Sequence, residues 1–124
     1  VELIAAFSAI ANQGKMVRPH VVDTVVFASG KQASDKPTVI REVITPTTAS
    51  RLTAMMVSVV ENGYGSKAGV PGYLVAGKTG TAQVPKEDGV GYSDKTIHSF
   101  IGFAPAFNPK FIALLKLDNP KGIP

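Results

Sequence analysis

Three strand-like segments at the end of the chain, joined by short connections, constrain its fold more than any other feature. Residues 73–83, 96–104 and 111–117 have the composition of strands, and they are separated by a polar, glycine-containing loop over 84–95 and a tight turn at Asn108-Pro109. A connection between parallel strands usually contains a helix, and neither connection has a helical pattern. We therefore expect the three segments to pair as an antiparallel sheet.

Two helical segments come before this sheet. Residues 1–13 have apolar side chains at helical spacing, and Gly14 follows as a left-handed C-cap. Thr45 and Pro46 have the residue types of an N-cap and a first helical position, so a second helix is expected from there to Gly63. Its apolar stripe predicts core positions at Leu52, Met55, Met56, Val59 and Val60.

Two further strands are expected between the helices, over residues 19–28 and 38–44, with residues 29–37 as the loop of a hairpin between them. The order of elements predicts the α+β class, in which helices pack against an antiparallel sheet. A length of 124 residues fits one domain or part of one.

The stretch GYLVAGKTGTAQ at residues 72–83 matches two motifs that both use Lys78. Gly72 to Thr79 has the spacing of a phosphate-binding P-loop, which needs a strand before its first glycine and a helix beginning at its lysine. A loop precedes Gly72, and GTAQVP follows Thr79 without a helical period. We therefore reject the nucleotide-binding interpretation.

As a strand, the same residues can form one wall of a binding cleft. Lys78 supplies a cation, and Thr79 and Thr81 lie two residues apart, so their hydroxyls share a face of the strand. Gly80 has no side chain and lets a substrate approach the backbone closely. A backbone N–H on this strand can also stabilise a developing oxyanion. Alternatively, K-T-G-T alone is an ordinary strand end with a glycine bulge.

Composition removes several other classes of function. There are no cysteines, which excludes disulfides, thiol catalysis and thiolate metal sites. His20 and His98 have no acidic partner at metal spacing, so we expect no metal and no cofactor. The net charge of +4 comes from scattered residues, and no aromatic-basic motif predicts nucleic-acid binding. No run of roughly 18 apolar residues is present to span a membrane.

The longer context carries a family resemblance. VAGKTGTAQ, followed after a polar loop by SFIGFAPA, closely resembles the penicillin-binding transpeptidases that cross-link peptidoglycan, and in particular their monofunctional, class B type. AAFSAIANQGKMVRPHVV resembles the helix and strand that precede the family's last sheet strands, and TPTTASRLTAMMVSVVENGYG resembles its penultimate long helix. The resemblance covers nearly the whole chain. It implies a partial penicillin-binding/serine β-lactamase-like transpeptidase fold.

The resemblance also implies an activity and residue roles. The family's serine attacks the D-alanyl-D-alanine end of a peptidoglycan stem peptide, outside the cytoplasmic membrane, and β-lactam antibiotics trap that serine. By motif, Lys78 and Thr81 take catalytic positions, the lysine as a charge beside the site and the Thr81 N–H as half of an oxyanion hole. Thr79, Gly80 and Thr81 line the substrate or the β-lactam carboxylate.

The sequence departs from the family pattern in one respect. The family requires S-x-x-K and S-x-N, and none of the eight serines begins either motif. Both motifs precede K-T-G in the family, so we expect residues 1–124 to be the C-terminal segment of one transpeptidase domain. The nucleophile, and a membrane anchor in the parent protein, would lie upstream. A segment separated from the rest of its domain would expose apolar surface, which favours a dimer or a swap.

Two alternatives for the function and one for the site remain open. A β-lactam sensor or binding module shares the serine-lysine core and K-T-G, and a serine β-lactamase or D,D-carboxypeptidase is a more distant relative. Within the site, the expected loop 84–95 is either a solvated connection or a rim over the cleft, with Tyr92 as its candidate substrate contact.

Overall fold

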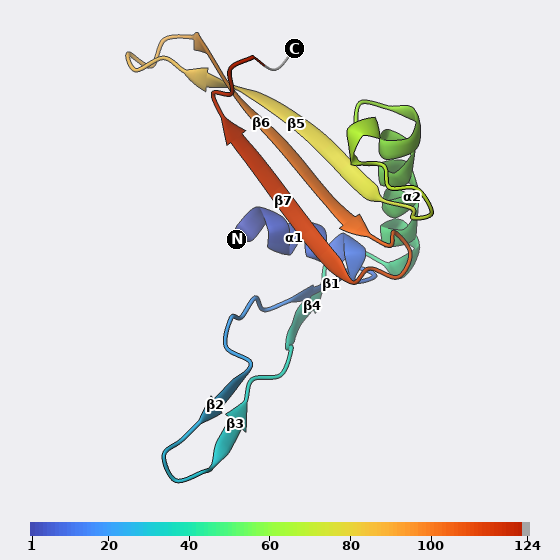
Figure 1. Ribbon diagram of the computed structural model, residues 1–124, viewed down its shortest axis with the longest axis vertical. Coiled ribbons are helices and arrows are strands. Elements are labelled where there is room, and N and C mark those ends of the chain that lie inside the picture. The colour runs from blue at the N-terminus through green and yellow to red at the C-terminus, as the bar shows by residue number, and fades with distance from the viewer. Residues whose placement is uncertain (123–124) are drawn as a thin grey trace.

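The computed structural model describes residues 1–122, so the last two residues of the expected 1–124 segment lie outside the described residues. Its body is a three-stranded antiparallel sheet with two helices (Figure 1). The sheet order is β5 (Ala76–Pro85), β6 (Tyr92–Ala104) and β7 (Phe111–Asp118). The α+β class and the antiparallel pairing expected from the sequence are confirmed.

Helix α1 (Glu2–Ala11) crosses the back of the sheet in Figure 1, where it contacts β6 and β7. Helix α2 (Pro46–Asn62) packs against β5 and is followed by the short 3-10 helix η1 (Ser66–Ala68). The buried core lies between these helices and one end of the sheet, and it consists of Met56, Val57, Ala76, Phe103 and Ala106. Phe7, Ile10, Ala11 and Ile112 pack around it.

The ends of both helices follow from local chemistry. The Thr45 side chain accepts a hydrogen bond from the Thr48 backbone N–H at 3.2 Å, and Pro46 begins α2, as the sequence predicts. At the end of α1 the C-cap is Asn12, and Gln13 (φ 55°) and Gly14 (φ 91°) both follow with positive φ, so the left-handed conformation expected at Gly14 is present and begins one residue earlier. Gly14 N–H closes the turn on the Ala9 carbonyl at 2.7 Å.

The segment between the helices differs from the expected hairpin of residues 19–28 with 38–44. It contains four short strands: β1 (Lys15–Val17), β2 (Thr24–Val26), β3 (Gln32–Ser34) and β4 (Val39–Glu42). β1 pairs with β4 and β2 pairs with β3, so β3 lies within the stretch expected to be a loop. Pro19 and Pro37 lack the N–H needed for a continuous ladder, which accounts for the break between the two pairs.

This segment extends away from the sheet as an arm, with the β2–β3 turn at its tip (Figure 1). Within residues 1–122, the arm contacts the body at its base, where β1 packs against α1. In the part of the chain that the structure describes, neither helix is long and apolar enough to cross a lipid bilayer.

Candidate functional site

The predicted site residues lie on β5, which is an edge strand because β6 is the one strand of residues 1–122 that pairs with it. In the β5–β6 register, Lys78 is opposite Ile101, Thr79 opposite Phe100, Gly80 opposite Ser99 and Thr81 opposite His98. Opposite residues in an antiparallel pair share a face of the sheet. Thr79 and Thr81 therefore lie on one face of the sheet with Phe100 and His98, as the period of two predicts. We call this the front face, because α1 crosses the other side (Figure 1).

Lys78 lies on the opposite face, together with the buried Ile101 of β6 and the partly buried Leu114 of β7. Its side chain nevertheless reaches the strand edge, since its Nζ donates to the Thr79 carbonyl at 2.8 Å. The ammonium group thus lies at the open edge of β5, although the lysine side chain and the two threonine side chains leave the strand on different faces.

The backbone of β5 also presents hydrogen-bonding groups at this edge. The Leu74 carbonyl, just before the strand, accepts from Ala106 N–H on the side of β6. Because successive residues direct their backbone groups to alternate edges, Lys78 and Gly80 face β6. Thr79 and Thr81 therefore direct their N–H and C=O groups to the open edge, where a bound molecule can meet them.

Two glycines allow close packing at the base of this strand. Gly77 and Gly102 are opposite each other and buried, and the Phe100 ring covers both. A Cβ at Gly77 would lie 2.8 Å from Phe100 Cε2, and a Cβ at Gly102 would lie 2.8 Å from Phe100 Cε1. The ring thereby replaces the missing side chains and holds β5 against β6 directly before Lys78.

Gly80 has a different environment from the one the sequence suggested. A Cβ there would lie 2.6 Å from Ser99 Oγ, so the space above Gly80 contains the end of the Ser99 side chain. Ser99 was not singled out in the sequence. The reason is that its importance depends on the register between β5 and β6, which the sequence alone does not give.

His98 is the second residue that the register brings to the site. It lies opposite Thr81, and its Nε2 is 3.0 Å from Thr96 Oγ1 on the same face. His20, in contrast, is exposed near the base of the arm and contacts the Arg18 carbonyl at 3.3 Å. Among residues 1–122, no three His, Asp or Glu side chains gather closely enough to hold a metal ion.

The segment 84–95, interpreted from sequence as one loop, is strand over half of its length. β5 continues to Pro85 and β6 begins at Tyr92, which pairs with Pro85. The remaining turn, 86–91, lies at the far tip of a long hairpin (Figure 1). Thr81 and Lys86 are five residues apart, about 17 Å along an extended strand. The turn therefore lies well beyond the K-T-G-T residues.

The comparisons with known proteins identify the family to which this antiparallel sheet and its helices belong. Residues 1–123 match the family model described as "Penicillin binding protein transpeptidase domain". The chain belongs to the penicillin-binding protein transpeptidase family. The resemblance stated from sequence is thereby confirmed.

Two curated relatives and one solved structure illustrate the match. Stage V sporulation protein D of Bacillus subtilis is 40% identical over 98% of this chain and 19% of its own length. The probable peptidoglycan D,D-transpeptidase PbpC of Pseudomonas aeruginosa is 39% identical over 98% of this chain and 20% of its own. Penicillin-binding protein 3 of Mycobacterium tuberculosis, solved with aztreonam, has a TM-score of 0.89 at 35% identity, covering 96% of this chain and 28% of that one. The chain thus spans about a fifth of the length of the curated relatives it matches.

Proposed function

We propose that residues 1–124 form the substrate-binding wall of a peptidoglycan D,D-transpeptidase that works through a serine acyl-enzyme and is inhibited by β-lactams. The observation that supports this most directly is the open edge of β5, where Lys78 Nζ bonds the Thr79 carbonyl and Thr81 directs its N–H outward. A cation, two hydroxyls and a free backbone donor at one strand edge suit a ligand that carries a carboxylate beside an acyl group.

In this proposal a serine outside these 124 residues attacks the carbonyl carbon of the penultimate D-alanine. The Thr81 N–H donates to the oxygen that becomes negative, while the Thr79 and Thr81 hydroxyls bind the terminal carboxylate. The peptide bond breaks, the terminal D-alanine leaves with a proton on its nitrogen, and the acyl group remains on the serine. An amine of a neighbouring stem peptide then attacks the ester, forms the cross-link and releases the serine.

The proposal includes the setting of the complete protein. Lys78 acts as a charge that favours deprotonated groups near the serine. The rest of the transpeptidase domain precedes these residues and supplies the nucleophile. The complete protein is anchored in the cytoplasmic membrane and faces the peptidoglycan outside it. Stem peptides and β-lactams are its ligands.

Labelling with a fluorescent penicillin tests the proposal. The complete gene product that carries these residues should become covalently labelled and should hold the label for many minutes. Residues 1–124 expressed alone should not be labelled. If the complete, folded protein failed to react, the enzyme proposal would be wrong.

Two further readouts separate the alternative functions. Rapid loss of the label with release of hydrolysed penicillin would indicate a β-lactamase. Stable labelling without cross-linking of a stem-peptide donor to an amine acceptor would indicate a sensor module. The transpeptidase proposal requires both stable labelling and cross-link formation.

A further inference from the structure

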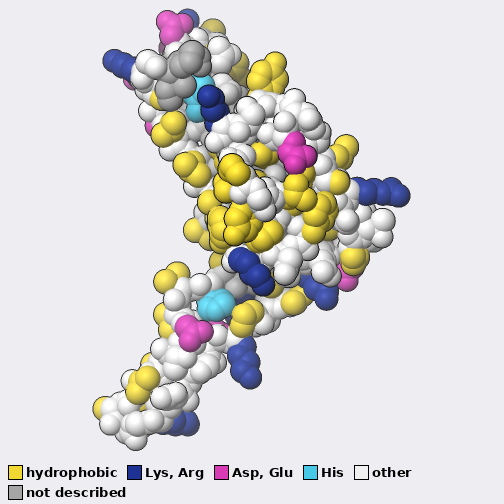
Figure 2. All heavy atoms as spheres, turned by 45° about the vertical axis from the view of Figure 1, so that its right-hand side comes forward, with side chains coloured by type: hydrophobic (Ala, Val, Ile, Leu, Met, Phe, Trp, Pro, Cys, Tyr) yellow, Lys and Arg dark blue, Asp and Glu magenta, His cyan; other side chains and the backbone are white. Residues whose placement is uncertain are grey.

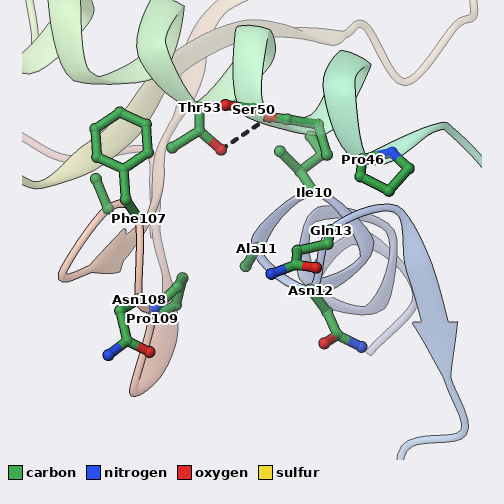
Figure 3. A pocket seen from close by; sticks show the side chains of 12 residues that line it. Ile10, Ala11, Asn12, Gln13, Pro46, Ser50, Thr53, Phe107, Asn108 and Pro109 are labelled. Carbon is green, nitrogen blue, oxygen red and sulfur yellow. Dashed lines mark hydrogen bonds between the residues drawn. The ribbon is translucent and has the colours of Figure 1, made fainter.

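A polar cavity lies at the end of the sheet opposite the long β5–β6 hairpin tip. It forms where the end of α1, the first turns of α2 and the turn between β6 and β7 meet (Figure 3), and its volume is about 330 Å³. None of its lining residues belongs to the K-T-G-T strand. The cavity is therefore separate from the site assigned to acyl transfer.

The hydrogen-bonding side chains of this cavity are all neutral. Carboxamides come from Asn12, Gln13 and Asn108, and hydroxyls from Ser50 and Thr53. No Asp, Glu, Lys, Arg or His from the described part of the chain is among the lining residues. A charged ligand would lose hydration here without meeting an opposite charge, so the lining favours a neutral one.

Much of this hydrogen-bonding capacity is not used by other groups of residues 1–122. Thr53 is 4% exposed and its Oγ1 donates to the Ala49 carbonyl at 2.9 Å, which leaves its oxygen free to accept. Asn12 Nδ2 donates to the Lys15 carbonyl at 3.1 Å, which leaves Oδ1 free to accept. The side chains of Gln13, Ser50 and Asn108 make no hydrogen bond to another group of residues 1–122.

Gln13 stands at a backbone position where glycine is favoured. Its φ of 55° is left-handed, and it directly follows the C-cap of α1, where a glycine commonly closes the helix. A glutamine in this conformation is disfavoured for its backbone but adds a carboxamide to the cavity. Backbone strain of this kind concentrates at functional sites.

The opposite side of the cavity is aromatic. Phe107 lies across from Gln13 (Figure 3) and remains 59% exposed, so one face of its ring is available to a ligand. An aromatic face together with several neutral donors and acceptors suits a ring that is apolar on one side and carries hydroxyl and amide groups around its rim.

We propose that this cavity binds an N-acetylated amino sugar. The carboxamides match the acetamido group, because each offers both a donor and an acceptor, and the Phe107 ring packs against the apolar face of the sugar. The inference rests on the proposed function only for the source of the sugar, since the glycan strands of peptidoglycan would present it near the acyl-transfer site.

The test uses the complete gene product and an N-acetylglucosamine trisaccharide, titrated by calorimetry and by saturation-transfer NMR. Asn108→Ala and Phe107→Ala should each weaken binding about tenfold, as expected for removal of one good contact. Phe111→Ala, which removes an exposed aromatic ring outside this cavity, should leave binding unchanged.

Gln13→Gly distinguishes a loss of binding from a loss of folding. It relieves the left-handed strain, so thermal stability should stay equal or rise, while binding of the trisaccharide should weaken. Three results would overturn the proposal: no saturable binding to the folded protein, equal binding by all the cavity variants, or binding of a D-alanyl-D-alanine peptide at the cavity in place of the sugar.

The cavity proposal and the transpeptidase proposal can fail separately. Asn108→Ala should react with fluorescent penicillin at the unaltered rate, because Asn108 lies outside the K-T-G-T strand. If the unaltered protein did not react with fluorescent penicillin, the acyl-transfer proposal would be rejected. The result of the sugar titration would still stand.

Discussion

The position of Lys78 bears most directly on the acyl transfer proposed for the edge of β5. Its ammonium group bends around the edge of β5 to the Thr79 carbonyl, and it thereby approaches the side of the strand that carries the free N–H of Thr81. A cation fixed at this place can stabilise negative charge that develops beside the strand.

Lys78→Ala should therefore slow labelling of the complete gene product by fluorescent penicillin by about 100-fold, the scale of one preorganised electrostatic contact. The second-order labelling rate measures this. Lys116→Ala is the matched control, because Lys116 is an exposed lysine on β7, 3.8 Å from Asp118. Similar rates for both variants would contradict the role of Lys78.

Gly77 is a position at which the fold requires the absence of a side chain. Gly77→Ala would bring a Cβ against the Phe100 ring, and overpacking of this kind costs about 1–3 kcal/mol. Urea unfolding of the complete gene product measures the loss. In a Phe100→Leu background the cost of Gly77→Ala should fall, and additive losses would show that the ring is not the cause.

At the scale of elements, α2 positions β5 because the two pack together along the core. Its N-cap should therefore matter to the fold. Thr45→Ala removes the acceptor for Thr48 N–H and should lower the free energy of unfolding by about 1 kcal/mol. Thr47→Ala, in the same exposed turn without a side-chain bond, should be neutral or slightly stabilising.

The sequence predicted elements with clear local signals and missed those that depend on pairing. Both helices and the three-stranded sheet follow from periodicity and cap residues. In α2, however, Met56 is 7% exposed and Met55 is 66% exposed, so the prediction that both fill the core was wrong for Met55. The buried stripe instead includes Thr53, which is possible because its hydroxyl bonds the Ala49 carbonyl.

The candidate site, like the fold, was predictable from the sequence where local geometry decides it and not where strand pairing does. The shared face of Thr79 and Thr81 follows from strand geometry alone. The partners of Ser99, Phe100 and His98 on β5 could not be predicted, because they depend on a register set by a turn that is shorter than the sequence suggested. The roles of Lys78, Thr79, Gly80 and Thr81 stay predictions until they are measured.

At the scale of the whole molecule, the front face of the sheet is largely uncovered by the two helices. Neither α1 nor α2 lies over it in Figure 1, and Figure 2 shows hydrophobic side chains gathered over the middle of the body. Phe111 is 63% exposed and Leu115 is 58% exposed on this face. Apolar patches of this kind favour association.

The 124-residue chain alone should therefore self-associate with rising concentration, as measured by sedimentation velocity. Leu115→Lys should shift the chain toward the monomer, because it puts a charge into the apolar face. Val21→Lys is the control, since Val21 is a fully exposed residue of the arm. A chain that remained monomeric, or that responded equally to both changes, would contradict an association through the sheet.

The arm has a practical consequence. β2 and β3 pair with each other, and the arm joins the body only through β1 and β4 at its base. Residues 28–31 at its tip are therefore a suitable insertion point for a small fluorescent or affinity label, because the inserted residues would extend from a turn that lies away from β5. Under the proposed function, a protein labelled there should react with fluorescent penicillin at the rate of the unlabelled protein, and it could be followed in living cells.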